Sequence, residues 1–312
     1  MIPILLLILL FAMPAVSIQG ASNGLLLWFH IVLPTLAPFM ICTQLITMFG
    51  GIEYFMRPCA PFFRHFFHLS SAGGYVLLCG LLCGYPIGAK LCADFCRRGL
   101  ITEQEGKYLL AICNHPSPMF LLGYVKNQLP ADTPALLILL CMYLPILPLS
   151  FAAKKVYHIR RPINKNTLPT SASRMSLDEI LMSVCDTLVL IGGYIMIFSI
   201  LTAWIAEIPI FSVKTKALLS GIAEITTGIH QICSCNAFSI PLLPVIASVS
   251  FGGLSGIFQT RSVLSRSQTE LSNESDNTKN AGLSIRHYLF WKLLHMIGSC
   301  FTLVLLLLVP LQ

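Results

Sequence analysis

Residues 79–124 read CGLLCGYPIGAKLCADFCRRGLITEQEGKYLLAICNHPSPMFLLGY, and this stretch decides how the chain folds. It places the motifs GYPIGAK and NHPSP inside segments that are apolar enough to lie in a membrane. Glycine and proline interrupt the helical hydrogen-bond ladder there and leave backbone N–H and C=O groups without partners. In hydrocarbon such groups are tolerated only where they are buried in protein or line a wet cavity. Two breaks so close together therefore predict a binding site at membrane depth, as in secondary transporters with broken helices.

The composition excludes an ordinary soluble domain. Hydrophobic residues make up 55% of the 312 positions, charged residues make up 11%, and the mean hydropathy is +0.78. Soluble domains carry about a quarter charged residues. The chain is therefore predicted to be an all-α, polytopic membrane helix bundle with broken or re-entrant helices.

Several apolar segments qualify as spans, because a transmembrane helix needs about 20 mainly apolar residues. They are residues 2–17, 25–49, 74–95, 108–125, 135–152, 181–205, 217–232, 240–258 and 288–309. Some are short or interrupted by glycine, so about seven to nine crossings are expected. The first segment lacks the basic start of a signal peptide, and we interpret it as a retained span, with a cleaved signal as the alternative.

Charge patterning predicts the topology. The net charge of +7 comes mainly from connections between apolar segments, so a nucleic-acid partner is not expected. Basic residues gather in residues 153–176, which the positive-inside rule makes a cytoplasmic loop. Residues 261–284 are polar and lack apolar periodicity, which predicts a flexible loop. Aromatic and basic residues alternate in residues 56–68, which fits a segment at the membrane interface, with a loop packed on the bundle as the alternative.

A faint internal repeat divides the single multipass domain, residues 1–312, into halves of about 20–152 and 177–309. LLCGLLCGYPIGAK at 77–90 parallels LLSGIAEITTGIHQ at 218–231. Gly80 precedes Asn114 by 34 residues, and Gly221 precedes Ser255 by the same number. Duplicated, inverted halves are typical of transporter folds, whose sites form between the halves. The alternative is chance similarity between apolar sequences.

The first half supplies two groups of candidate binding residues. Lys90 is an ammonium in an apolar helix, where it faces a cavity, pairs with Asp94 one turn later, or reaches the interface. Asn114, His115 and Ser117 surround the second break, where freed backbone donors and a helix N-terminus favour an anion. His115 is also a candidate pH sensor. The alternative is a turn at the membrane surface.

The second half supplies the others. Glu224 and Thr226 lie in an apolar run, and an isolated carboxylate there indicates a proton relay, a cation ligand or a solute partner. The alternative is a hairpin tip near water. The motif FGGLSG, whose paired glycines permit close backbone approach, adds the remaining candidates: Gly252, Gly253, Ser255 and Gln259.

The sequence does not predict an enzyme, a cofactor or a metal site. It carries no GxSxG, HExxH, Walker or paired-carboxylate signature. Most of its twelve cysteines lie in apolar runs, where cysteine acts as a small hydrophobe, so no structural disulfide is expected.

These motifs resemble those of the YlbJ-type sporulation integral membrane proteins, a family with a nucleoside-recognition Gate domain. The resemblance is carried by GYPIGAK, by the CN and P-x-F-x-x-G residues of 113–123, and by GLLLWFHIVLPTLAPFMI at 24–41. GIAEITTGI, FGGLSGIFQ and the closing KLLH at 292–295 extend it over nearly the whole chain. The sequence departs from the family pattern in the HPS that follows Asn114 and in a longer loop after Gln259.

The resemblance implies a role in moving dipicolinic acid, a small planar dianion, toward the forespore. It also implies the mother-cell-derived outer forespore membrane as the location. The expected partners are the lipid bilayer, an anionic solute, and either a second copy or other sporulation membrane proteins. The alternatives are a nucleoside or ion carrier, and a membrane assembly factor of sporulation that transports nothing.

Overall fold

The computed structural model describes residues 2–159, 176–269 and 283–308, and these residues form helices and short connections without a strand. The first half contains α1 Ile2–Ala12, α2 Pro14–Leu27, η1 Trp28–Val32, α3 Leu33–Met48, α4 Ile52–Met56, α5 Ala60–Phe62, η2 Phe63–Phe67, α6 Ser71–Cys83, α7 Ile87–Arg97, α8 Glu103–Ile112, α9 Pro118–Phe120, η3 Leu121–Val125, α10 Lys126–Gln128, α11 Ala135–Tyr143 and α12 Ile146–Val156. The second half contains α13 Leu177–Glu207, α14 Val213–Ala223, α15 Ile225–Ser234, α16 Leu242–Phe251, α17 Gly253–Thr269 and α18 Ile285–Leu308. The predicted all-α fold is confirmed, and the chain is a multipass membrane protein.

The number of spans is smaller than the sequence predicts. Within the described residues, 5 helices are long and apolar enough to cross a membrane, or up to 6 if one bent pair counts as a span. The prediction of about seven to nine crossings is wrong because three of its segments, residues 74–95, 108–125 and 217–232, are divided by breaks. Each piece is too short to cross alone.

The N-terminal segment also differs from the prediction. Residues 2–17 do not form one span, because α1 ends at Ala12 and α2 begins at Pro14. The first long apolar helix is Pro14–Met48. Its α-helical ladder changes to the π-helical turn η1 directly before Pro34, where proline removes a backbone donor.

Residues 56–68 form short helices set across the bundle. The helical segment Ala60–Phe67 meets α6 at 94°. Phe63 and Phe67 are buried against the bundle, whereas Phe62 is 56% exposed. The segment is therefore amphipathic, with one aromatic face on the protein and the other turned away from it.

Apolar side chains gather into two cores. The first core joins α3, α4, α6, α7, α8, α12, α13 and the start of α18. The second core joins η3, α11, α15, α16 and the later part of α18. The chain passes between the two cores several times, and two of these passages lie between Cys113 and Leu121 and between Val249 and Val263. Both passages coincide with helix breaks, so the breaks lie where the two cores meet.

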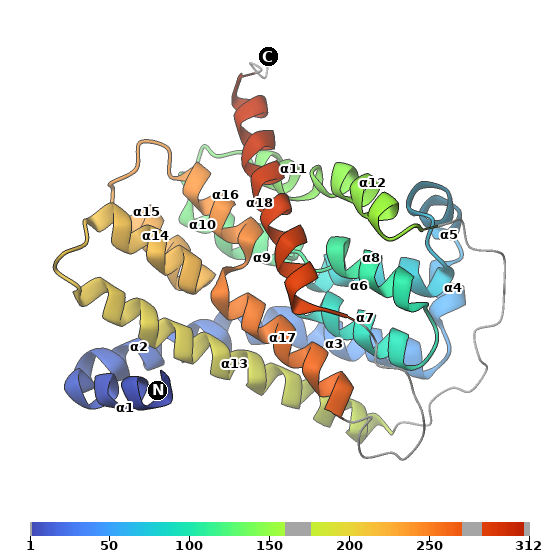
Figure 1. The fold of residues 1–312 in the computed structure, drawn as a ribbon, viewed down its shortest axis with the longest axis horizontal. Coiled ribbons are helices and arrows are strands. Elements are labelled where there is room, and N and C mark those ends of the chain that lie inside the picture. Colours follow the sequence, from blue (N-terminus) through green and yellow to red (C-terminus); the bar gives the residue numbers. More distant parts are fainter. Residues whose placement is uncertain (1, 160–175, 270–282, 309–312) are drawn as a thin grey trace.

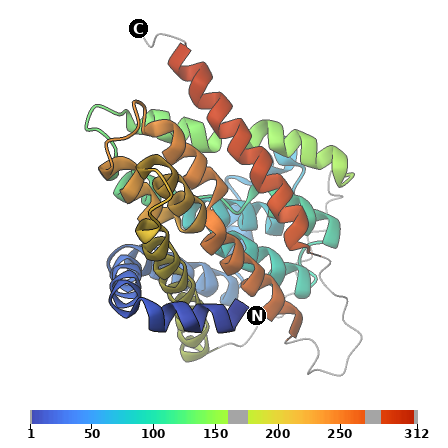
Figure 2. The same ribbon diagram turned by 60° about the vertical axis from the view of Figure 1, so that its left-hand side comes forward.

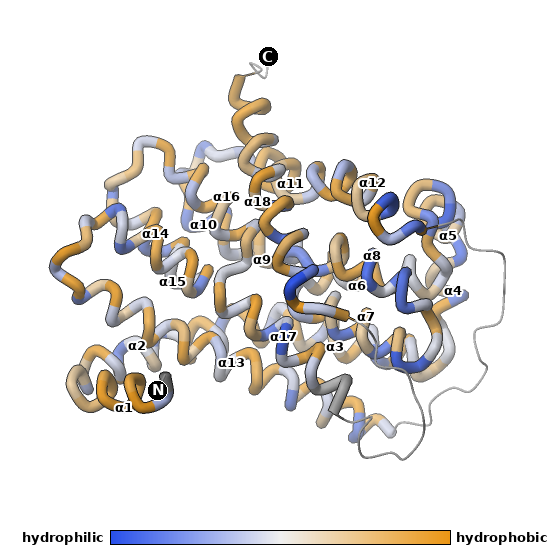
Figure 3. The backbone as a smooth tube through the Cα atoms, in the orientation of Figure 1, coloured by the Kyte–Doolittle hydropathy of each residue, from blue (hydrophilic) through white to orange (hydrophobic). Residues whose placement is uncertain are grey.

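Two long helices tie the arrangement together. In Figures 1 and 2, α13 runs beside α2 and α3, and α18 crosses the region where the short helices meet. The Trp28 indole donates a hydrogen bond to the Leu188 carbonyl oxygen across the first of these contacts, at 3.0 Å. Figure 3 shows hydrophobic residues along the outer helices α1, α13 and α18 and hydrophilic residues at the ends of α7 and α12.

Parts of both predicted loops are helical. Residues 153–156 belong to α12, and residues 261–269 continue α17, so the prediction of a flexible loop over 261–284 is wrong for its first part. The central parts of these loops, residues 160–175 and 270–282, lie outside the described residues.

Candidate functional site

The short helices form two hairpins and two broken helices. The first hairpin is α6 and α7, which turn at Gly84, and the second is α14 and α15, which turn at Glu224. The first broken helix is α8 followed by the continuous helical residues 118–128. The second is α16 followed by α17, with the break at Gly252. The two breaks predicted within residues 79–124 are present. Glu224 lies at a hairpin tip, which was the alternative interpretation of this residue, but it is buried.

The four breaks surround one cavity, which we name the central cavity. Its volume is about 50 Å³. Helices α3 and α13 close it on the other sides. The lining residues at the breaks are Gly84, Tyr85, Pro116, Ser117, Glu224, Ile225, Thr226, Gly252, Ser255 and Gln259. Of the ten residues predicted from the sequence, those that share this cavity are Ser117, Glu224, Thr226, Gly252, Ser255 and Gln259.

Polar side chains begin new helices at two breaks. Ser117 accepts a hydrogen bond from the Phe120 N–H at 3.2 Å and caps the helix that follows. The Glu224 carboxylate accepts from the Thr227 N–H at 2.8 Å and caps α15. The Thr226 hydroxyl also donates to Glu224. Together with α7 and α17, these helices direct four N-termini, the positive ends of their dipoles, at the same region.

The paired glycines let the second broken helix approach its neighbours. Both have positive φ, 85° at Gly252 and 65° at Gly253, a conformation that side chains disfavour. A Cβ atom at Gly253 would lie 3.1 Å from Cγ2 of Ile225 in the second hairpin. Beyond this break, the Gln259 side chain donates to the hydroxyl of Ser255, one turn earlier on α17, at 2.9 Å. The predicted close backbone approach is confirmed.

Asn114 connects three elements and does not line the central cavity. Its Nδ2 donates to the Thr260 hydroxyl at 3.1 Å and to the Tyr288 hydroxyl at 3.0 Å. Its Oδ1 accepts from the Ala89 N–H at 3.3 Å. The side chain is buried and holds the first break against α7, α17 and α18.

Lys292 is a functional candidate that the sequence analysis did not assign. It lies on α18 and is 2% exposed, and its Nζ donates to the Asn114 carbonyl oxygen at 3.0 Å. The same atom lies 5.2 Å from the centroid of the Tyr85 ring, which lines the central cavity. Among the residues that the structure describes, no carboxylate pairs with it. An ionisable residue in an apolar span is the signal that would have found it.

His115 packs against a second buried histidine from the same helix as Lys292. The ring centroids of His115 and His295 are 4.0 Å apart. Both side chains are buried, and His295 is also absent from the predicted set. The first break therefore contacts two ionisable residues of α18.

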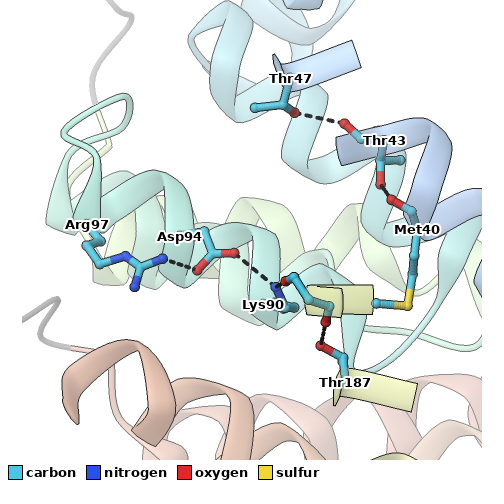
Figure 4. Close-up of polar contacts among 8 residues, drawn as sticks. Met40, Thr43, Thr47, Lys90, Asp94, Arg97 and Thr187 are labelled. Atoms are coloured by element: carbon cyan, nitrogen blue, oxygen red, sulfur yellow. Dashed lines mark hydrogen bonds and ion pairs between the residues drawn. The ribbon is translucent and has the colours of Figure 1, made fainter. Parts of the chain in front are cut away.

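Lys90 lies away from the four breaks, in a cavity of about 570 Å³ that we name the outer cavity. This cavity lies between α3, α7 and α13. Lys90 pairs with Asp94 at 3.4 Å, and Asp94 pairs with Arg97 at 3.0 Å, as Figure 4 shows. The Lys90 ammonium also donates to the Ser183 hydroxyl at 3.5 Å. The predicted pairing with Asp94 is confirmed.

The two cavities follow the same helices. Helix α3 contributes Leu36 to the central cavity and Met40 to the outer cavity. Helix α13 contributes Ile191 to the central cavity and Leu190 to the outer one. The first hairpin contributes Tyr85 to the central cavity and Ile87 to the outer one. Apolar side chains therefore separate a wide, charged cavity from a narrow one at the breaks.

Comparison with known proteins agrees with the motifs. The chain is similar to the sporulation integral membrane protein YlbJ of Bacillus subtilis strain 168, with 27% identity over an alignment of 294 residues. The alignment covers 81% of this chain and 71% of that protein. No family model and no solved structure matches the chain. The similarity covers the region of all four breaks and supports the family resemblance of the motifs, while the Gate domain stays a prediction. The chain is similar to the YlbJ-type sporulation integral membrane proteins over most of its length.

Proposed function

We propose that this protein is a transporter of the sporulating cell that moves a small anionic metabolite across a membrane. The proposed solute is dipicolinic acid, and the proposed direction is toward the forespore across the outer forespore membrane. The similarity to a sporulation membrane protein supports the cellular setting. The anionic solute is supported by the chemistry around the central cavity.

Lys292 carries this proposal. Its amino group is buried in a membrane-spanning helix without a carboxylate partner among the described residues, and a positive charge there is costly. An anion in the central cavity, which the Tyr85 ring lines, offsets that cost. A cation in the same place would increase it.

The helix breaks supply further recognition. Four helix N-termini are directed at the central cavity, and backbone N–H groups at helix N-termini bind carboxylates and phosphates. A planar dicarboxylate can accept hydrogen bonds at each of its two carboxylates. Backbone N–H groups at the N-termini in both hairpins and both broken helices could donate to it from different sides. The Glu224 carboxylate is held by the Thr227 N–H and the Thr226 hydroxyl, which direct its charge toward α15.

The sizes of the cavities support alternating access. About 50 Å³ holds one or two water molecules, so the central cavity must widen before a dicarboxylate enters. The outer cavity, at about 570 Å³, is within the usual size range of ligand sites. It lies beside the start of α13, which follows the predicted cytoplasmic loop. We therefore assign the outer cavity as the cytoplasmic entrance and the apolar residues between the cavities as the gate.

Counterflow in proteoliposomes tests the proposal. The full chain is reconstituted into vesicles loaded with unlabelled dipicolinate, and entry of labelled dipicolinate is measured against protein-free vesicles. Accumulation that excess dipicolinate abolishes, and that nucleosides and other dicarboxylates reduce less, supports the proposal. Preference for a nucleoside or an inorganic ion would indicate the other carrier functions. No exchange of any of these solutes would indicate an assembly factor.

A further inference from the structure

His295 has a backbone carbonyl oxygen within 3.4 Å of each of its ring nitrogens. It is fully buried on α18. Its Nε2 lies 2.9 Å from the carbonyl oxygen of Met142 on α11, and its Nδ1 lies 3.4 Å from the carbonyl oxygen of Ser250 on α16. A neutral imidazole carries one N–H, so it can donate to only one of these oxygens. Imidazolium donates to both.

His115 gives this site a second imidazole. Its ring lies against that of His295, and neither of its ring nitrogens has a hydrogen-bond partner among the described residues. An unpartnered buried nitrogen is costly, and it leaves an acceptor or a donor available beside His295. Since His115 follows Asn114 at the first break, the pair joins this break to α18.

Among the described residues, the surroundings of the pair contain positive charge and no compensating negative charge. The titratable groups that face His295 are His115, from the first break, and Lys292, from the preceding turn of α18. The facing helices α11 and α16 contribute carbonyl oxygens and carry no acidic or basic residue. A proton added to the pair therefore meets the Lys292 charge at short range and is repelled by it.

An anion in the central cavity changes this balance. Lys292 lies near both the histidine pair and the Tyr85 ring, so an anion in the cavity that Tyr85 lines attracts both the Lys292 charge and the added proton. By linkage, a proton on the pair raises the affinity for the anion by the same factor. The carbonyl of Ser250 stands two residues before the break at Gly252, so the proton also acts directly on the second broken helix.

We propose that His295, with His115 packed against it, is a proton-binding site that couples the movement of the anion to a proton moving in the same direction. This inference rests on the transport function proposed above and adds its coupling ion. One proton is taken up with each anion on one side of the membrane and released with it on the other.

Proteoliposomes under an imposed pH gradient test the coupling. In the wild-type protein, dipicolinate accumulates when the side from which it enters is acidic, and internal pyranine fluorescence reports protons entering with it. For His295→Gln and His115→Gln we expect counterflow of labelled dipicolinate to persist while the gradient-driven accumulation is lost. His287→Gln is the matched control, because His287 is exposed on the same helix, and it should behave as the wild type.

The outcomes separate the two proposals. Absence of counterflow in the wild type contradicts the transport function. Counterflow without any response to the pH gradient contradicts the proton site, as does gradient-driven accumulation in His295→Gln that equals that of the wild type.

A spectroscopic measurement with and without solute tests the site directly. Wild-type protein with nitrogen-15 histidine in lipid nanodiscs is observed by NMR from about pH 8 to about pH 5, the range in which histidines titrate. With saturating dipicolinate we expect an imidazolium signal with two N–H groups that exchange slowly with water, since the site is buried, and without dipicolinate we expect this signal to be weaker. If only one-proton imidazole is found among the slowly exchanging signals down to about pH 5 in the presence of dipicolinate, the proton site is rejected.

Discussion

Lys292 and Lys90 are both lysines in apolar segments, yet they differ in exposure and in their partners. The side chain of Lys90 is 19% exposed and pairs with Asp94, whereas Lys292 is 2% exposed overall and donates to a backbone carbonyl. The i,i+4 spacing of Asp94 made the first arrangement predictable. The partner of Lys292 is Asn114, which is 178 positions away, so no local pattern indicated it.

Removing the Lys292 charge should separate transport from stability. We expect Lys292→Met, which keeps an unbranched chain, to lower the affinity or rate for dipicolinate at least about tenfold, equivalent to about 1.4 kcal/mol. The thermal unfolding temperature in detergent should be unchanged or slightly higher, because the variant no longer buries an uncompensated charge. The exposed Lys214 provides the control Lys214→Met, which should alter neither quantity. Unchanged transport by Lys292→Met would contradict the role assigned to this ammonium.

For a substitution at Glu224 we expect the opposite effect on the affinity for dipicolinate. Glu224→Gln keeps an oxygen that accepts from the Thr227 N–H but removes a negative charge from the wall of the central cavity. We therefore expect a several-fold lower half-saturation concentration for dipicolinate, because the anion is no longer repelled. Concentration dependence of counterflow measures it. A weaker or abolished affinity would show that the ionised carboxylate acts on the solute or on the proton.

At the scale of the elements, the two hairpins close through glycine. Helices α6 and α7 cross at Gly80 and Gly88, and α14 and α15 cross at Gly221 and Gly228. In the first hairpin both glycines also contact the carbonyl oxygen of Cys113, at the end of α8. The same local arrangement thus occurs in each half, while the internal repeat itself stays a prediction.

A methyl group at the first crossing should disrupt the hairpin. A Cβ atom at Gly88 would overlap the carbonyl oxygen of Cys113, which is backbone and cannot rotate away. We expect Gly88→Ala to lower the free energy of unfolding by about 1–3 kcal/mol, the usual cost of overpacking. Gly193→Ala on α13 is the matched control, since its Cβ meets no atom within 4 Å, and it should be neutral or stabilising. Equal thermal stability of the two variants would contradict the tight crossing.

The sequence predicted some breaks better than others. Glycine and proline mark Gly84, Pro86, Pro116 and Pro118, so the breaks in residues 79–124 were predictable. Neither glycine nor proline stands next to Glu224 in the sequence. Its extended backbone, φ −144° and ψ 124°, arises from packing at the tip of the second hairpin. Residues 217–232 were expected as a short or glycine-interrupted span, with a hairpin tip at Glu224 only as the alternative, and Glu224 was singled out for its chemistry alone.

At the scale of the whole molecule, the site lies between two packed cores. Six of the ten predicted residues meet in the central cavity, but Lys90 lies in the outer cavity, and Lys292 and His295 were missed. Residue chemistry was predictable because isolated polar groups stand out in apolar segments. The grouping of helices into cores depends on contacts between distant segments, such as α2 with α13, which periodicity does not encode.

Filling the outer cavity should block entry without unfolding the protein. Ser183 lines this cavity on α13, and we expect Ser183→Trp to reduce dipicolinate counterflow strongly because the indole occupies the entrance. Val189, on the same helix, is 64% exposed on the outer surface, so Val189→Trp is the matched control and should transport normally. Equal transport by two well-folded variants would show that the solute reaches the central cavity by another route.

The right-angle turn before α6 fixes how deep the central cavity lies. Given the interfacial position that the aromatic and basic residues of 56–68 predict, α6 starts at the membrane surface and enters the bilayer. Its 13 residues span about 20 Å, which brings Gly84 beyond the middle of a hydrocarbon layer of about 30 Å. This depth is measured from one membrane surface only. A thicker bilayer therefore lengthens the path on the opposite side alone, so lipid thickness should change the rates of entry and release unequally.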